Sequence, residues 1–486
     1  MAQRFDLLIR NATLIDGTGA LPRKGDLGVN GDRIVAMGDL SAASADREID
    51  AQGKALAPGF IDAHTHDDTV VLCGPECVVP KLSQGVTTVV IGNCGISLAP
   101  VKMNRRPPAP LDLVGDADVW QYESFAAYAE QLRKTPPAVN TYALIGHMVL
   151  RCEAMDFDLD RPATDKEAER MKTRLAEALK EGASGFSTGL WYPPSRHAPT
   201  DEVIAVAEAL RDYGGLYVTH MRDEADGVID SIEETLKIGR ETGSAVVISH
   251  HKCTMPENFG RSTETLAYIE KAMQKQTVNF DVYPYTASST ALLVDRLRDD
   301  MPVQIATSVP HPEMAGRMLS DIAKEWGTDI RTAAQRLLPA GAIYFMMDEA
   351  DVSRIVAHPR SMIGSDGIPS NDMPHPRLWG TFPRVLGHYA RDLGLISLEA
   401  AVHKMTGLTA SVFGMADRGV LKEGAFADLV LFDPDTVIDT ATFAAPKTPA
   451  KGILEVWVNG VSSYVGGKGV TGESAGRLIT RQPLPA

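Results

Sequence analysis

The chain has 486 residues, of which 44% are hydrophobic and 23% are charged. This balance is that of a globular protein and excludes a disordered or collagen-like chain. Its 63 acidic residues exceed its 48 basic ones and give a net charge of −15, so the chain lacks the basic surface that nucleic-acid binding requires. The sequence shows no signal-peptide segment at its start and no membrane-spanning run. We therefore expect a cytoplasmic protein that binds neither nucleic acid nor a membrane.

The five cysteines are too few and too scattered to hold a chain of this length together. They are Cys73, Cys77, Cys94, Cys152 and Cys253. An odd number in a long chain does not indicate a disulfide framework. The fold is therefore expected to depend on its hydrophobic core.

Both ends of the chain have the pattern of short strands and tight turns. Short apolar runs punctuated by Asn, Asp and Gly are typical of β-hairpins. They occupy residues 6–10, 12–17, 26–29 and 33–38 near the start, and 427–433 and 456–460 near the end. We expect residues 1–57 and 415–486 to pair into one small β-domain.

Between the ends, residues 58–414 alternate buried-strand patterns with amphipathic helices such as 165–181 and 201–213. Eight strands end near His64, Gly92, His147, Ser187, His220, His250, Tyr283 and Asp366. Eight strand–helix units predict an α/β fold, a TIM-type (β/α)8 barrel. The link from strand seven to strand eight is too long for one helix. We expect an insertion there, about residues 286–348, over the barrel mouth, where insertions commonly act as lids or specificity elements.

Four histidines gather at the same end of three predicted barrel strands. His64 and His66 close the first strand, and alternate residues of a strand point to the same side. An isolated His-x-His pair is as readily a hydrogen-bonded loop pair, but His220 and His250 end strands five and six. The four together indicate a metal site at the barrel mouth.

Two further side chains reach this mouth from other strands. Cys94 follows strand two between glycines, in Gly92-Asn93-Cys94-Gly95. A cysteine is most often a buried inert thiol, but zinc binds thiolate, imidazole and carboxylate together. Asp366 ends strand eight, on the face where the catalytic groups of barrels collect.

With these residues the chain resembles the N-acyl-D-amino-acid deacylase (D-aminoacylase) family of the amidohydrolase superfamily, along essentially its whole length. Its most specific motif is the Gly-Asn-Cys-Gly sequence around Cys94, and residues 419–428 resemble the superfamily's return into the β-domain. Most binuclear amidohydrolases bridge their metals with a carboxylated lysine on strand four, which residues 185–189 lack. The resemblance implies that Cys94 takes the bridging position.

The resemblance also implies the roles of the other site residues. Cys94, His220 and His250 would hold one tight zinc ion, while His64 and His66 would form a second, weaker metal position. Asp366 matches the catalytic aspartate of the family. The residues that match substrate-binding positions are Lys252, Tyr283, Arg377, Ser289 and Tyr192.

A mechanism follows from this set of groups. Zinc acts as a Lewis acid on the amide carbonyl and lowers the pKa of water. Asp366 would accept a proton from the water and return it to the leaving amine. Lys252 and Arg377, with a hydrogen bond from Tyr283, would hold the α-carboxylate of the substrate. Only the family resemblance indicates that the substrate is an N-acyl-D-amino acid.

Several substrates and functions are compatible with this sequence. Arg296, at the start of the insertion, favours N-acyl-D-glutamate, because a protein of charge −15 needs a local cation to bind an acidic side chain. The opposing hypothesis places Arg296 and Arg298 on the lid surface and leaves an apolar pocket for D-methionine or D-leucine. The pattern also fits, less closely, a hydantoinase-like cyclic-amide hydrolase or a non-catalytic scaffold. The oligomeric state does not follow from the sequence.

Overall fold

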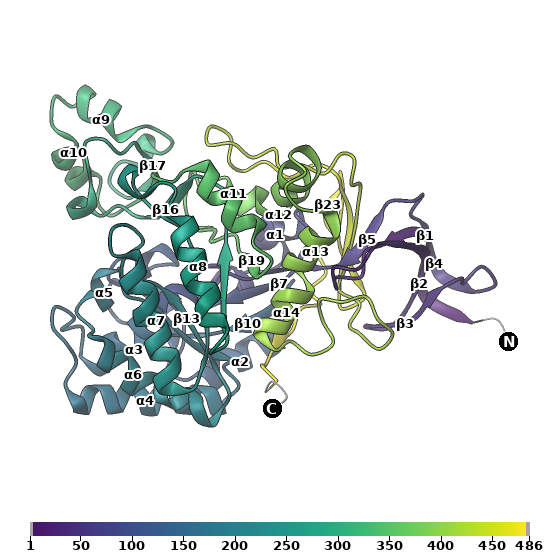
Figure 1. Ribbon diagram of the computed structural model, residues 1–486, viewed down its shortest axis with the longest axis horizontal. Helices are drawn as coiled ribbons and strands as arrows, with labels where there is room; N and C mark the ends of the chain where they lie inside the picture. The colour runs from purple at the N-terminus through teal and green to yellow at the C-terminus, as the bar shows by residue number, and fades with distance from the viewer. Residues whose placement is uncertain (1–2, 483–486) are drawn as a thin grey trace.

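Eight parallel strands close into a barrel at the centre of the computed structural model, which describes residues 3–482 (Figure 1). In chain order they are β6 (Phe60–Asp62), β7 (Val86–Ile91), β10 (Asn140–Ala143) continued by β11 (Ile145–Gly146), β12 (Gly185–Gly189), β13 (Leu216–His220), β14 (Ala245–Ile248), β15 (Val278–Val282) and β19 (Ser361–Ile363). The Ala63 N–H donates to the Ile363 carbonyl at 3.2 Å and closes the ring. The predicted TIM-type barrel is confirmed.

The barrel strands are buried on both faces, as parallel strands covered by helices must be. All six residues of β7 are buried. The helices are α1 (Val79–Leu82), α2 (Phe125–Lys134), α3 (His147–Ala154), α4 (Asp165–Lys180), α5 (Pro193–Arg196), α6 (Thr200–Ala207), α7 (Val228–Thr242), α8 (Ser262–Met273), α11 (Glu349–Ala357), α12 (Arg377–Arg384), α13 (Leu398–Met405) and α14 (Gly407–Phe413). Within residues 3–482, no helix is long and apolar enough to cross a membrane.

Helix α4 shows how local sequence sets these helices. The Thr164 side chain accepts from the Glu167 N–H and the Glu167 carboxylate accepts from the Thr164 N–H, which forms a capping box. Met171, Leu175 and Leu179 then recur on one face and are buried. The cap fixes where the helix starts, and the apolar stripe fixes which face covers the barrel.

The two chain ends meet in one sheet, at the side of the molecule where purple and yellow ribbons lie together (Figure 1). Its strand order is β23-β22-β21-β20-β5-β1-β2-β3, with β4 beside β1. The strands are β1 (Arg4–Leu14), β2 (Arg23–Asn30), β3 (Arg33–Gly38), β4 (Ser44–Asp50), β5 (Ala55–Pro58), β20 (Leu429–Phe432), β21 (Ile453–Val458), β22 (Val461–Val465) and β23 (Gly469–Val470).

Two details of these ends differ from the expectation. Residues 6–17 were expected to form two strands, but β1 continues through a register shift between Ile9 and Ala12, with Asn11 at a φ of 55°. Such a bulge adds a residue without ending the strand. At the other end, β24 (Leu478–Ile479) leaves the sheet of the chain ends and pairs in parallel with β10 of the barrel.

The segment after β15 forms a separate small layer at the end of the molecule opposite the N-terminal strands (Figure 1). Strands β16 (Ala287–Ala291), β17 (Val303–Ser308) and β18 (Ala340–Phe345) form an antiparallel sheet in the order β16-β18-β17. Helices α9 (Leu319–Glu325) and α10 (Ile330–Leu337) lie between β17 and β18 in the chain. This layer has its own buried apolar cluster, so it forms a packed unit.

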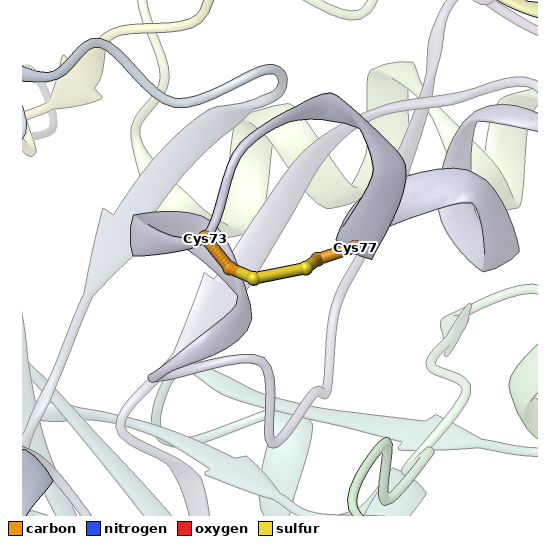
Figure 2. The surroundings of a disulfide bond; sticks show 2 residues. All are labelled: Cys73 and Cys77. Atoms are coloured by element: carbon orange, nitrogen blue, oxygen red, sulfur yellow. A yellow bond between two sulfur atoms is a disulfide. The ribbon is translucent and has the colours of Figure 1, made fainter.

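The structure pairs two of the five cysteines, which the sequence did not predict. Cys73 and Cys77 form a disulfide in the segment between β6 and α1 (Figure 2). Their separation of four residues places their Cα atoms 5.9 Å apart, within the range that a disulfide spans. Cys94, Cys152 and Cys253 are free and buried.

A buried lysine joins the first barrel strand to the last. Lys81 donates to Asp62 at the end of β6 and to the Ser365 hydroxyl after β19, both at 2.8 Å, and lies 3.2 Å from Asp67. Asp62 also accepts from the Ser365 N–H at 2.7 Å. Removing one partner of a buried charge pair is strongly destabilising. This cluster therefore holds the loop after β6 against the loop after β19.

Candidate metal centre and active site

The predicted metal ligands converge at the carboxyl ends of the barrel strands. The Cys94 Sγ lies 3.3 Å from His64 Nε2, 3.8 Å from His220 Nδ1 and 3.5 Å from His250 Nε2. The sequence places these residues at the ends of four strands, and the barrel brings those ends together. All five predicted ligands, His66 included, are buried.

Three overlapping sets of donor atoms could each hold a metal ion. They are Cys94 with His220 and His250, His64 and His66 with Cys94, and His64 and His250 with Asp366, with all donor atoms of a set within 4.8 Å of one another. Cys94 belongs to the first two sets, which supports the bridging position implied for it. Sulfur and imidazole nitrogen are ligands that zinc prefers. The donors present therefore fit a metal ion.

The backbone around Cys94 requires its two glycines. Gly92 has a φ of 79°, and a Cβ there would lie 2.1 Å from the Leu144 carbonyl oxygen. Gly95 has a φ of 80°, and Cys94 itself takes a φ of 53°. On strand four, Ser187 accepts from the Gly95 N–H at 3.0 Å and donates to the Gly92 carbonyl. Strand four, which carries no lysine, thus holds the cysteine loop in place through Ser187.

The surrounding imidazoles favour the thiolate form of Cys94. Burial raises the pKa of a thiol, but the charge of His64 and hydrogen bonds from His220 and His250 hold the pKa of Cys94 well below its ordinary value. A thiolate is the form that binds metal. Cys94 is therefore in the form in which a cysteine binds a metal ion.

Asp366 lies between the metal ligands and a buried arginine. Its Oδ1 is 3.2 Å from His66 Nε2 and 3.5 Å from His64 Nε2, and its Oδ2 is 2.8 Å from Arg377 Nη2. Burial alone would raise the pKa of Asp366, but Arg377 and His250 hold it well below its usual range. The carboxylate is therefore ionised and can accept a proton.

A cavity with about 170 Å³ of space accessible to water opens beside these residues. Eight predicted site residues line it: Tyr192, His220, His250, Lys252, Tyr283, Ser289, Arg296 and Asp366. The Tyr192 hydroxyl accepts from Thr290 at 3.0 Å, and the Ser289 hydroxyl has no hydrogen-bond partner within residues 3–482. Catalytic and substrate-binding candidates thus share one cavity.

Arg377 is set behind the cavity wall. It is fully buried at the start of α12, and it is not among the lining residues of the described chain. Its Nη2 contacts Asp366 and donates to the Ser289 carbonyl at 3.0 Å. Its Nε and Nη1 have no hydrogen-bond partner in residues 3–482. The guanidinium lies 4.4 Å from the Tyr283 ring centre.

Arg296 lines the cavity on the side of the insertion. Its guanidinium lies 5.0 Å from the Trp191 ring centre and forms no salt bridge with the described residues. Arg298, two residues later, pairs with Glu257 at 2.6 Å and Asp300 at 2.7 Å on the surface. Surface pairing therefore accounts for Arg298 and not for Arg296.

Two buried carboxylates at the site were missed in the sequence. Glu224 lies 3.1 Å from His250 Nδ1 and 2.7 Å from Lys252 Nζ, and Asp281 lies 3.6 Å from His64 Nδ1. Asp281 also accepts from the His250 N–H at 2.9 Å. A charged residue inside the apolar strand β15 was a signal for Asp281, since unpaired charges are rarely buried. Glu224 lies in a polar loop, where nothing distinguished it.

The comparisons with known proteins agree with this geometry. The profile described as Amidohydrolase family matches residues 47–277 and 243–464. A D-aminoacylase of Alcaligenes xylosoxydans xylosoxydans is 54% identical over 99% of this chain and 98% of its own. From the same organism, an N-acyl-D-aspartate deacylase is 52% identical, covering 94% and 91%, and an N-acyl-D-glutamate deacylase is 48% identical, covering 96% and 94%.

Two solved structures that resemble this chain are also deacylases of N-acyl-D-amino acids. A D-aminoacylase, studied for the functional role of its binuclear metal centre, has 53% identity and a TM-score of 0.95 over 98% of this chain and all of its own. An N-acyl-D-glutamate deacylase from Bordetella bronchiseptica, complexed with zinc and a phosphonate mimic of the tetrahedral intermediate, has 47% identity and a TM-score of 0.94 over the same shares. The chain therefore belongs to the amidohydrolase family and, within it, to the N-acyl-D-amino-acid deacylases.

Proposed function

We propose that this protein hydrolyses the amide bond of N-acyl-D-amino acids to a carboxylate and a free D-amino acid. The observation that carries the proposal is the position of Asp366, which contacts two of the candidate metal ligands and lines the same cavity as Lys252. A base beside a metal centre, with a cation across the same cavity, fits a substrate that has an amide bond next to a carboxylate. The D-aminoacylases and D-glutamate deacylase that resemble the chain support this substrate class.

A direct assay tests the proposal. Turnover is expected with N-acetyl-D-amino acids and is expected to be absent with the L enantiomers and with hydantoins. Hydantoin turnover would favour a cyclic-amide hydrolase, for which the similarity to hydantoinases, at 17% identity, shows only a shared fold. Complete inactivity of the zinc-loaded protein would favour a scaffold role.

We infer that Cys94, His220 and His250 hold one zinc tightly, with His64 and His66 as a second, weaker position. When bound, the metal supplies Lewis acidity to the amide carbonyl and lowers the pKa of water. The protein's own residues hold the reacting groups in place. Asp366 Oδ2 is held by Arg377, which leaves Oδ1, the oxygen that faces the imidazoles, to receive the proton from water and return it to the leaving amine.

The α-carboxylate of the substrate is assigned to the side of the cavity where Lys252 and Tyr283 line the wall and Arg377 lies behind it. Lys252 lies 5.6 Å from the Tyr283 ring centre and Arg377 lies 4.4 Å from it. Burial lowers the pKa of the Lys252 ammonium, but the charge of Glu224 and the hydrogen bond to it raise the pKa by more, so the ammonium stays charged. Carboxylate, amide and side chain held at three points distinguish one enantiomer from the other.

For the substrate side chain we propose a preference for D-glutamate. Arg296 carries this proposal, because it lines the cavity and has no carboxylate partner among the described residues. A specific observation also favours a hydrophobic side chain: Met255, Met301 and Met346 line the same cavity. Methionine adapts to apolar groups such as a D-methionine or D-leucine side chain.

The first prediction concerns the metal. Purified protein is expected to retain one zinc per chain after dialysis, and Cys94→Ala or His220→Ala is expected to lose it, because each removes one of three ligands. Elemental analysis measures the zinc. Cys152→Ala, which removes a buried thiol outside the site, serves as the control and should keep its zinc. Full zinc content in Cys94→Ala would contradict the ligand assignment.

The second prediction concerns the proton carrier. Asp366→Asn keeps the shape of the side chain and removes the proton acceptor, so kcat is expected to fall by about 10²–10⁴-fold, the contribution of a general acid–base group. Steady-state kinetics and zinc analysis on the same sample separate this loss from loss of metal. A near-normal kcat would move the role to another residue.

The third prediction concerns the carboxylate clamp. Arg377→Ala removes charge-assisted hydrogen bonds of about 1.5–3 kcal/mol, which corresponds to a loss of roughly ten- to hundredfold in kcat/KM for the free acid. The α-amide analogue, which lacks the charge, is expected to lose less, because it loses only what Arg377 contributes through its contact with Asp366. Equal losses for acid and amide would show that Arg377 acts only through its contact with Asp366.

The fourth prediction separates the two side-chain preferences. Arg296→Ala is expected to lower kcat/KM for N-acetyl-D-glutamate far more than for N-acetyl-D-methionine, because only the acidic side chain loses a charged partner. Arg298→Ala, which removes a paired surface arginine two residues away, is the matched control and should affect neither substrate. Equal effects of Arg296→Ala on both substrates, or a wild-type preference for D-methionine, would favour the apolar pocket.

A further inference from the structure

Glu224 is a buried carboxylate for which the deacylation steps have no use. It lies in the loop after β13, four residues beyond His220, and is 7% exposed. A buried carboxylate is costly unless it is paired. Its neighbours therefore indicate what it does.

Both oxygens of Glu224 face imidazoles of the candidate tight metal site. Oε1 is 3.1 Å from His250 Nδ1, and Oε2 is 3.7 Å from His220 Nε2. These are the ring nitrogens on the far side from the sulfur, since His250 Nε2 and His220 Nδ1 face Cys94 Sγ. One carboxylate thus lies behind both imidazoles, although the two rings use opposite nitrogens toward the sulfur.

This arrangement matches a general requirement of metal-binding histidines. An imidazole that binds a metal through one nitrogen carries its proton on the other, and an acceptor for that N–H fixes the tautomer and the ring orientation. His220 comes from β13 and His250 from the end of β14, so their backbones alone do not fix the angle between the rings. Glu224 contacts both rings at once.

Lys252 completes the surroundings of this carboxylate. Its ammonium donates to Glu224 Oε1 at 2.7 Å and to the His250 carbonyl at 2.9 Å, and its Nζ also lies 2.6 Å from His250 Nδ1, the ring nitrogen that Glu224 faces. The lysine balances the charge of Glu224, so the carboxylate is ionised in a buried position. Lys252 also lines the cavity, so its contacts connect Glu224 and His250 with the cavity wall.

We propose that Glu224 is a positioning residue whose carboxylate, 3.1 Å from His250 Nδ1 and 3.7 Å from His220 Nε2, orients both imidazoles and thereby sets the affinity of the tight metal site. The proposal rests on the proposed ligand set of Cys94, His220 and His250. Glu224 itself contacts neither the substrate nor the metal in this role. Its removal acts on zinc binding before any substrate is present.

The test is a zinc titration of the metal-free full-length protein against a chelator of known affinity, with no substrate. Glu224→Gln keeps the size of the side chain but replaces one acceptor oxygen with an NH₂ donor, so it cannot present an oxygen to both rings. Loss of such a contact typically costs 10–100-fold in metal affinity, and the zinc Kd of Glu224→Gln is expected to rise by about this factor. A zinc Kd equal to that of wild type would overturn the proposal.

Two control variants separate this role from loss of charge or of the lysine. Asp226→Asn removes an acidic group from the same loop, where Asp226 is exposed and accepts from Asn258 at 2.9 Å, and its zinc Kd should equal that of wild type. Lys252→Met should also leave the zinc Kd close to wild type while raising KM. A Lys252→Met defect as large as that of Glu224→Gln would overturn the proposal, since Glu224 would then act through the lysine.

Further variants cover failure to fold and failure of the ligand assignment. If Glu224→Gln does not fold, as judged by circular dichroism, Glu224→Asp replaces it; the shorter side chain cannot reach both rings and is likewise expected to weaken zinc binding. Wild-type affinity in Glu224→Asp would overturn the proposal. Cys94→Ala run in parallel tests the ligand set: wild-type zinc affinity there would overturn the metal site itself, whereas its loss together with normal affinity in Glu224→Gln would overturn only the role of Glu224.

Discussion

The position of one buried sulfur atom constrains the whole mouth of this barrel. Cys94 Sγ lies within 3.8 Å of nitrogens from three histidines that follow three different strands. A buried thiolate is stable only if positive or polar partners surround it. The loops after β6, β7, β13 and β14 must therefore keep their relative positions, and the glycines at 92 and 95 make the approach of the cysteine loop sterically feasible.

Charges alternate outward from the sulfur in two directions. One chain runs through His250 and Glu224 to Lys252, and the other runs through His66 and Asp366 to Arg377. Both end on a cation beside the Tyr283 ring. In a protein of charge −15, these two cations are the local positive charges that the anionic substrate proposed above would require. The same groups that stabilise the metal centre thus prepare the binding site.

The sequence predicted the parts of the site that lie at strand ends. The carboxyl ends of barrel strands meet at one face whatever their distance in the chain, so His64, Cys94 and His220 could be placed together from strand patterns alone. Side chains in loops have no such rule. The partners of Glu224 and of Arg377 depend on how separate loops pack. The bulge at Asn11 and the pairing of Cys73 with Cys77 depend in the same way on local backbone geometry that composition does not reveal.

The groups proposed for the reaction and the groups that would contact the substrate side chain lie in different parts of the structure. The groups proposed for the amide and the α-carboxylate lie mainly on barrel strands and the loops that directly follow them. In contrast, Arg296, Met301, Tyr344 and Met346 reach the cavity from the layer formed by β16, β17 and β18, which has its own apolar core. Substitutions in that layer can change the wall that meets a side chain without moving a metal ligand, because the two sets pack in different cores. In this chain, the insertion could therefore change the proposed side-chain preference while the proposed metal site on the barrel stays the same.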